Sequence, residues 1–234
     1  MIGVALLLRF LLINAFAIFG SPMSSTAHSL RPLLLGSKSA TRLAILREMG
    51  YNPIVRSADI DEKAIGDRAG GDTADLVLQI ANAKADALLP LLLQDPQQRA
   101  GADVLLTADQ VVLHTNRVLE KPADLDEVRS NIASYARSPC QTIGSAVLCD
   151  LTSGKRFQGV DTATIYFSEM PEAVVDEVCE SHDILWCAGG LMIEHPAVQP
   201  YIVRIDGTLD SVMGLSKSLV SKLMQQMEEA RANS

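Results

Sequence analysis

The apolar residues of the chain fall into two patterns, short continuous runs and stretches with helical spacing. The run over residues 33–35 and the longer run over residues 104–113 are typical of strands that are buried on both faces. Between them, Leu43, Leu46 and Met49 recur at intervals of three, which predicts one buried helix face. Strand patterns and helix patterns alternate along the chain, so we predict an α/β fold with a mixed sheet.

The same patterns assign the other elements. We predict helices over about 40–49, 73–89, 124–136, 171–181 and 216–229, and strands over about 33–35, 53–57, 104–113, 141–150, 157–168 and 201–205, with a further short strand before Glu120. The turn signal Thr152-Ser153-Gly154 joins the two long strands. Neither an internal repeat nor a low-complexity linker interrupts this order, which favours a single domain over residues 23–234.

Residues 1–22 are set apart by their composition. Residues 2–20 are apolar except for Arg9 and Asn14, but Arg9 interrupts the middle of the run and no basic region precedes it, as one would in a signal peptide. The first acidic residue is Glu48, as an organelle presequence would require. The interpretation that we favour is that Met23 is the true start. We therefore expect a cytoplasmic protein in which residues 23–234 do not contact a membrane. The alternatives are organelle targeting or membrane anchoring through residues 1–22.

Composition excludes several classes of function. The chain of 234 residues carries a net charge of −8, and only 4% of its residues are aromatic, which argues against a polynucleotide-binding module. The four cysteines and four histidines show no zinc-ligand spacing. Scattered cysteines of this kind indicate a reducing compartment rather than a disulfide scaffold.

The segment from Gly36 to Arg42, GSKSATR, joins a predicted strand to a predicted helix. Small residues at a helix N-terminus leave backbone N–H groups open to an anion, and the hydroxyls and cations of this segment add donors for phosphate oxygens. The segment matches neither the Walker A nor the GxGxxG pattern. Taken alone, it is better explained as a capped helix start with a surface lysine and arginine.

Lys84 interrupts the apolar stripe of the helix predicted over 73–89. Val77, Ile80, Ala81 and Leu88 share this stripe, and Lys84 occupies its next position. A lysine on a core-facing stripe must be paired, extend to an edge or face a polar cleft. Both the edge and the cleft interpretations remain open from the sequence.

Asp109 interrupts the longest apolar strand. A carboxylate in such a strand is costly unless it is paired, bound to metal or catalytic. A turn at the end of a strand is the alternative, although Val111 and Val112 resume the strand at once.

Two further segments add charged groups. The acidic loop with Asp59, Asp61 and Glu62 offers oxygen ligands for a hard divalent cation, and Lys121 could contact a phosphate. A phosphate loop, cations and carboxylates together are what metal-assisted phosphoryl or nucleotidyl hydrolysis requires.

The ordered series of motifs resembles the Maf family of nucleoside triphosphate pyrophosphatases. The motifs are LLLGSKSATR, DIDE, ANAKA, TADQVV, LEKP, DTATIYF, AGGLMIE and IDGTLDSVMGL, and they extend from Leu33 to the last helix. The resemblance implies an elongated mixed α/β fold, similar to inosine triphosphatases, in which two lobes flank a nucleotide cleft. It also implies hydrolysis of a nucleotide to the monophosphate and pyrophosphate with a divalent metal, Mg²⁺ or Mn²⁺, and a possible homodimer.

The resemblance assigns roles to individual residues. The residues that it places against the triphosphate are Ser37, Ser39, Arg42, Lys84 and Lys121. It makes Asp109 the general base for the attacking water, and Glu62 together with Asp109 the metal-linked carboxylates.

Three positions bear on the base of the substrate. Gln110 and Glu194 match the branch that resembles 7-methyl-GTP pyrophosphatases. Thr41 matches neither this branch nor the branch that resembles dTTP/UTP pyrophosphatases. A carboxylate at position 194 could accept hydrogen bonds from the N1–H and the exocyclic amine of guanine. We therefore expect 7-methyl-GTP or a similar modified purine nucleotide, and the alternatives are a dTTP/UTP or modified-pyrimidine pyrophosphatase and a non-catalytic nucleotide-binding regulator of cell division.

Overall fold

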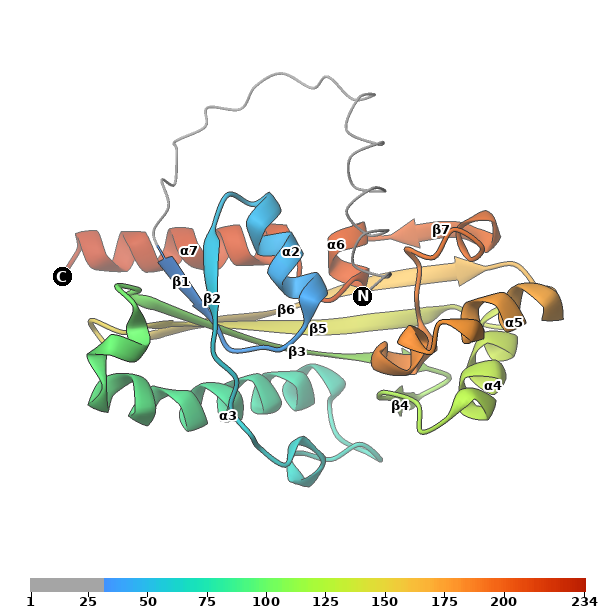
Figure 1. Cartoon of the computed structure of the whole chain (residues 1–234), viewed down its shortest axis with the longest axis horizontal. Helices are drawn as coiled ribbons and strands as arrows, with labels where there is room; N and C mark the ends of the chain where they lie inside the picture. The colour runs from blue at the N-terminus through green and yellow to red at the C-terminus, as the bar shows by residue number, and fades with distance from the viewer. Residues whose placement is uncertain (1–31) are drawn as a thin grey trace, which may run out of the picture.

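The computed structural model describes residues 32–234, so the predictions for residues 1–22 lie outside the described residues. A seven-stranded mixed sheet forms the centre of an elongated molecule, with helices on both of its faces (Figure 1). Its strands are β1 (Pro32–Leu35), β2 (Asn52–Val55), β3 (Val104–His114), β4 (Arg117–Leu119), β5 (Cys140–Asp150), β6 (Arg156–Phe167) and β7 (Ile202–Asp206). The α-helices are α2 (Ala40–Glu48), α3 (Thr73–Gln94), α4 (Leu125–Tyr135), α5 (Glu172–Glu180), α6 (Leu209–Val212) and α7 (Lys217–Ala232).

The order of the strands is β2-β1-β3-β5-β6-β7, and β4 pairs with β3 on the same side as β1. Strand β1 runs parallel to β2 and β3, whereas the neighbouring pairs β3–β5, β5–β6 and β6–β7 are antiparallel. The mixed α/β prediction is therefore confirmed. Strand β3 is the centre of the arrangement, because it is buried on both faces along most of its length.

The side chains pack into apolar clusters at the two ends of the sheet. One end combines α2, α3 and α7 with the first part of β3, and the other combines α4, α5 and β7 with its last part. Leu105, Leu106 and Ala108 belong to the first end and Val112 to the second. We call these the first half and the second half of the molecule, and Asp109 lies on β3 where they meet.

Most predicted boundaries lie within two residues of the observed ones, and helix α3 is the largest correction. We expected it to end at about Leu89, but it continues through Pro90, a residue that disfavours a helix interior, to Gln94. Pro90 is exposed, while Leu88 and Leu92 are both buried on the sheet, so packing of the apolar stripe carries the helix past the proline. The final helix also continues three residues further than expected, to Ala232, and the short helix α6 was not predicted.

Helix α3 is long and apolar enough to cross a membrane by length and composition. Seven of its side chains are buried in the fold, as in the core helix of a soluble domain: Leu76, Val77, Ile80, Ala81, Ala85, Leu88 and Leu92. Its hydropathy is therefore explained by packing against the sheet.

Candidate active site

The site begins at a gap in the hydrogen bonding of β3. On the side of β3 that faces β1, pairing with β1 ends at Leu106, and pairing with β4 begins only at Val112. The backbone between these residues has no strand partner on that side, and Asp109 lies in its middle. The loop after β1 and the loop after β4 both leave the sheet at this gap, which brings their side chains to Asp109.

The loop after β1 has the construction of a phosphate-binding turn. The Gly36 N–H donates to Leu106 O at 2.7 Å, and a Cβ at Gly36 would lie 2.6 Å from Thr107 Cγ2, so only glycine allows this close approach. Ser37 Oγ accepts from the Ser39 N–H at 3.2 Å, and Ser39 caps helix α2 by accepting from the Arg42 N–H at 3.3 Å. The two predicted serines therefore lie at a helix N-terminus, where an anion is stabilised.

Arg42 is held on three sides. Its Nη1 donates to Ser37 Oγ at 3.3 Å and to Ala108 O at 3.2 Å, and its Nε donates to Gly214 O at 2.9 Å. Burial lowers the pKa of this guanidinium, while the charges of Asp109 and Glu62 oppose the change. Arg42 is thus a rigid, positioned cation beside the helix N-terminus, as expected for a phosphate contact.

Lys84 joins the two predicted metal carboxylates. Its Nζ lies 2.7 Å from Asp109 Oδ1, 3.1 Å from Glu62 Oε1 and 3.4 Å from Ala108 O. The sequence left open whether Lys84 reaches an edge or faces a polar cleft, and these contacts show that it pairs with carboxylates at the junction of the two halves. Both Lys84 and Arg42 bond to the Ala108 carbonyl, a group that the gap in the sheet leaves without a strand partner.

Asp109 is a buried carboxylate whose pKa is subject to opposing influences. It is 7% exposed and lies inside β3, so the alternative of a turn at the strand end is wrong. Burial raises the pKa of this carboxyl, and Lys84 and Arg42 oppose the change. A buried carboxylate with a raised pKa is a better proton acceptor than an exposed one, as a general base requires.

The carboxylates suit a divalent cation only in combination with a substrate. Among residues 32–234 no group of three or more His, Cys, Asp or Glu side chains could hold a metal ion. Glu62 and Asp109 nevertheless converge on one ammonium group, so the same two carboxylates could share a cation. Mg²⁺ is commonly bound by one or two carboxylates together with substrate phosphates and water, and this pair fits that mode.

Lys121 and Glu194 lie in the second half of the molecule. Lys121 is exposed after β4, and its Nζ lies 5.5 Å from the centre of the Trp186 ring. Glu194 is half-buried, burial raises its pKa, and its carboxylate accepts a hydrogen bond from its own backbone N–H. The structure does not bring either residue into direct contact with Asp109.

Arg68 connects the two halves and was missed by the sequence analysis. Its Nη2 donates to Glu62 O at 2.7 Å and to Glu120 Oε1 at 3.0 Å, and its Nη1 donates to Ile65 O. It therefore ties the backbone of the acidic loop to the residue before Lys121. No local pattern in the sequence distinguishes this arginine from a surface one.

Gln110 and Thr41 form no hydrogen bond with Glu62 or Asp109 among residues 32–234. Gln110 points to the face of β3 opposite Asp109, and its Nε2 donates to Ser211 O at 2.7 Å. Thr41 is half-buried in the first turn of α2 and makes no side-chain hydrogen bond among residues 32–234. The predicted specificity positions are therefore divided between different surfaces of the site.

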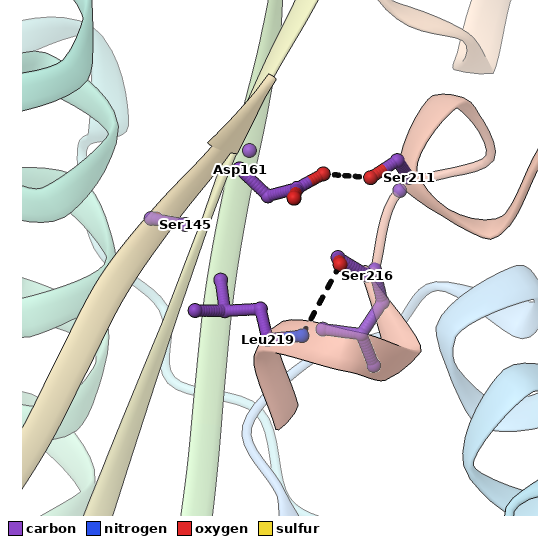
Figure 2. Close-up of a pocket in the computed structure, with 8 residues that line it drawn as sticks. Ser145, Asp161, Ser211, Ser216 and Leu219 are labelled. Atoms are coloured by element: carbon purple, nitrogen blue, oxygen red, sulfur yellow. Dashed lines mark hydrogen bonds between the residues drawn. The ribbon is translucent and has the colours of Figure 1, made fainter. Parts of the chain in front are cut away.

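A small pocket on the Gln110 face contains a second carboxylate (Figure 2). Asp161 on β6 is hydrogen-bonded by the Ser211 hydroxyl from α6, and burial raises its pKa. Gly144 on β5 lies between Gln110 on β3 and Asp161 on β6, and it also lines this pocket. Gly214, which also lines the pocket, accepts a hydrogen bond from Arg42 at its carbonyl oxygen, so the pocket wall helps to position the phosphate loop. An acidic residue in a predicted strand was the available signal for Asp161.

Comparisons with known proteins identify the family of the chain. The family model described as "Maf-like protein" matches residues 32–227. The chain is 34% identical over 199 residues to a protein named 7-methyl-GTP pyrophosphatase from Dictyostelium discoideum, which covers 85% of this chain and 98% of that protein. It is 30% identical over 193 residues to a nucleoside triphosphate pyrophosphatase from Corynebacterium aurimucosum, which covers 82% of this chain and 92% of that one.

The solved structures are more distant. A nucleoside-triphosphatase / dITP/XTP pyrophosphatase from Mycobacterium abscessus aligns with 87% of this chain and 97% of its own, at 12% identity and a TM-score of 0.40.

Proposed function

The chain belongs to the Maf family and is a nucleoside triphosphate pyrophosphatase, a hydrolase of nucleotide metabolism; from this premise we propose that its substrate is 7-methyl-GTP or a similar modified purine nucleotide. The observation that carries the catalytic part is the Asp109 carboxylate, buried inside a strand and held by Lys84 beside the phosphate loop. The relative named 7-methyl-GTP pyrophosphatase and the carboxylate at position 194 support the purine.

The triphosphate would lie across the gap in the sheet. Ser37, Ser39 and the open N–H groups of the first turn of α2 would donate to its oxygens. The Arg42 guanidinium, which contacts Ser37, would bind the same phosphate oxygens. Lys84 on one side and Lys121 on the other would neutralise the remaining charge. Five side chains from four segments, together with the N–H groups of α2, then hold one anion and fix the phosphorus atom relative to Asp109.

Asp109 would activate the water. Its carboxylate accepts a proton from a water molecule, whose oxygen attacks the α-phosphorus as the bond between that phosphorus and the α–β bridging oxygen breaks. The electron pair of that bond leaves with pyrophosphate, and the monophosphate remains. Lys84 holds the carboxylate in the orientation that receives the proton.

Maf family pyrophosphatases generally need a divalent metal. We propose that Glu62 and Asp109 hold it, together with phosphate oxygens, as the convergence of both carboxylates on Lys84 Nζ suggests. When bound, Mg²⁺ or Mn²⁺ would neutralise the charge of the triphosphate.

The purine would be recognised by Glu194. Among residues 32–234 no cation forms a salt bridge with this carboxylate, so its oxygens are available to a ligand. Guanine presents two donors on one edge, N1–H and the exocyclic amine, whereas uracil and thymine present one ring N–H. A carboxylate therefore favours the guanine edge over a pyrimidine edge.

The test is pyrophosphate release by the full chain with Mg²⁺ or Mn²⁺. The nucleotides are 7-methyl-GTP, GTP, UTP, CTP, dTTP and 5-methyl-UTP, and we expect the highest kcat/KM for 7-methyl-GTP. In Glu194→Gln the preference should move toward pyrimidines, since an amide both donates and accepts. A preference for pyrimidines in the unmodified chain, or an unchanged preference in the variant, would contradict the purine assignment. Tight nucleotide binding without turnover would instead favour a regulator.

A further inference from the structure

Trp186 is the most exposed large apolar side chain among the described residues. It is the single tryptophan of the chain, it is 74% exposed, and it ends a short 3-10 helix over Asp183–Trp186. An indole is costly to leave in water, because it has one of the largest apolar surfaces of any side chain. Neither the fold nor the catalytic roles above account for it.

The indole lies beside the predicted triphosphate contact. Lys121 Nζ is 5.5 Å from the centre of the ring, a distance typical of a cation–π contact. From there a continuous series of contacts leads back to the carboxylates. Glu120, next to Lys121, binds Arg68, and Arg68 binds the backbone oxygen of Glu62. This series of contacts connects Trp186 with Glu62, one of the two carboxylates that pair with Lys84.

The backbone three residues after Trp186 is held by hydrogen bonds on both sides of Gly189. The Gly189 N–H donates to Glu120 O at 2.8 Å, and Gly189 O accepts from the Tyr135 hydroxyl at 2.7 Å. A Cβ at Gly189, whose φ is +63°, would lie 2.5 Å from Tyr135 Oη, so this turn requires glycine. A fixed backbone allows an exposed ring to bind a ligand with little loss of conformational entropy.

Glu194 lies close to the same segment. The Cys187 thiol, adjacent in sequence to Trp186, has a pKa raised to about 12, first by burial and then by the nearby Glu194 carboxylate, while Lys121 opposes the change. The neighbourhood of Trp186 thus contains a cation suited to phosphate, an exposed indole and a carboxylate suited to a guanine edge.

We propose that Trp186 is the platform on which the nucleobase stacks, and that it favours a purine carrying a positive charge from N7-methylation. This inference rests on the proposed function, because it places the base of the same substrate. Any base can stack on an indole. A cationic base gains more, since the negative face of the ring attracts its charge as it attracts Lys121. Stacking on Trp186 recognises the face of the base, and hydrogen bonds to Glu194 recognise its edge. The two contacts together specify a methylated guanine.

Kinetics provide the first test. Trp186→Leu removes the π-face and keeps an apolar side chain, whereas Trp186→Phe keeps a smaller aromatic face. For 7-methyl-GTP we expect KM to rise about tenfold or more in the leucine variant and less than about threefold in the phenylalanine variant. The base is remote from the bond that breaks, so kcat should stay within about twofold. For UTP the rise should be smaller than for 7-methyl-GTP.

Fluorescence provides a second test that does not depend on turnover. Trp186 is the only tryptophan, so its emission in Asp109→Asn reports on this position alone. Stacking should quench the emission, and 7-methyl-GTP should do so at lower concentration than GTP or UTP. The matched control is Val203→Ala on β7, which removes another exposed apolar side chain and should change neither KM nor quenching.

The outcomes separate the two proposals. Turnover of 7-methyl-GTP with unchanged KM in Trp186→Leu and with unquenched emission would overturn the platform and leave the proposed substrate intact. Selective quenching by 7-methyl-GTP without its turnover would support the platform and overturn the substrate. A change in oligomeric state of Trp186→Leu without a change in KM would identify the ring as a contact between copies of the chain and also overturn the platform.

Discussion

Two buried aspartates on the same strand ladder, Asp109 and Asp150, have opposite properties. Asp109 lies on β3 and Asp150 on β5, where it is paired with Val104, five residues along β3 from Asp109. They are 7% and 2% exposed, and each contacts a basic side chain. The pKa of Asp109 is nevertheless raised and that of Asp150 is lowered.

The difference lies in the hydrogen bonds that each carboxylate accepts. Asp150 accepts from Arg231 Nε at 3.1 Å and Nη2 at 2.8 Å, from the Thr152 N–H at 2.9 Å and from Ser153 Oγ at 2.7 Å. Asp109 accepts from Lys84 alone, at 2.7 Å. Four hydrogen bonds compensate the buried charge of Asp150, whereas one does not compensate that of Asp109. Burial alone therefore does not distinguish the reactive carboxylate from the structural one. The number of hydrogen bonds that each carboxylate accepts does distinguish them.

Replacement of Asp109 should give the largest effect on activity. We expect Asp109→Asn to lose about 10²–10⁴-fold in kcat/KM, because a general base contributes about that much. The free energy of unfolding should be unchanged or higher, since the variant removes a poorly compensated buried charge. Pyrophosphate release and urea denaturation measure both. Asp150→Asn is the matched control, and an equal loss of activity in its folded fraction would contradict the comparison.

Removal of the Asp150 partner should give the largest effect on stability. Arg231→Met leaves a buried carboxylate without its main donors, which should cost about 3 kcal/mol in the free energy of unfolding. Urea denaturation at neutral pH measures this. The matched control is Arg129→Met, which breaks an exposed ion pair with Asp176 and should therefore cost much less than Arg231→Met. Equal costs in the two variants would show that Asp150 is not compensated by Arg231.

The same pair predicts a dependence of stability on pH. The pKa of Asp150 is below its ordinary value of 3.8, so its contribution to stability is present above that pH and is lost as the pH falls toward the lower value in the folded state. The difference in the free energy of unfolding between the unmodified chain and Arg231→Met should therefore shrink by about 1 kcal/mol between pH 4 and pH 3. A difference that is constant across this range would contradict the assignment.

The Arg68 bridge should give the smallest effect and test whether the carboxylates need external support. Arg68→Met should change the free energy of unfolding by less than about 1 kcal/mol, because its ion pair with Glu120 is partly exposed. We expect the Mg²⁺ concentration for half-maximal activity to rise about threefold to tenfold, since Arg68 no longer positions the backbone of Glu62. Arg129→Met again serves as control. An unchanged Mg²⁺ requirement would show that Glu62 is positioned without the bridge.

The sequence by itself determined the elements and the main charged groups of the site. Lys84 and Asp109 each interrupt an apolar pattern whose period is local, so each is visible without knowledge of its partner. The serines and Arg42 follow a strand and begin a helix, and this local order is sufficient to place them at a helix N-terminus. The end of α3 was predicted wrongly, because packing of Leu92 on the sheet outweighs the local preference of Pro90.

Only the tertiary structure decided which of these groups meet. The gap in the sheet beside Asp109 depends on where β1 and β4 end relative to β3, and the bridge from Arg68 to Glu120 joins residues 52 positions apart. The contact of Lys121 with Trp186 likewise joins separate segments. A pattern along the chain records the faces that each element buries, because burial repeats with the period of the element. It does not record which faces come together, because that depends on how the sheet is ordered and how the helices pack on it.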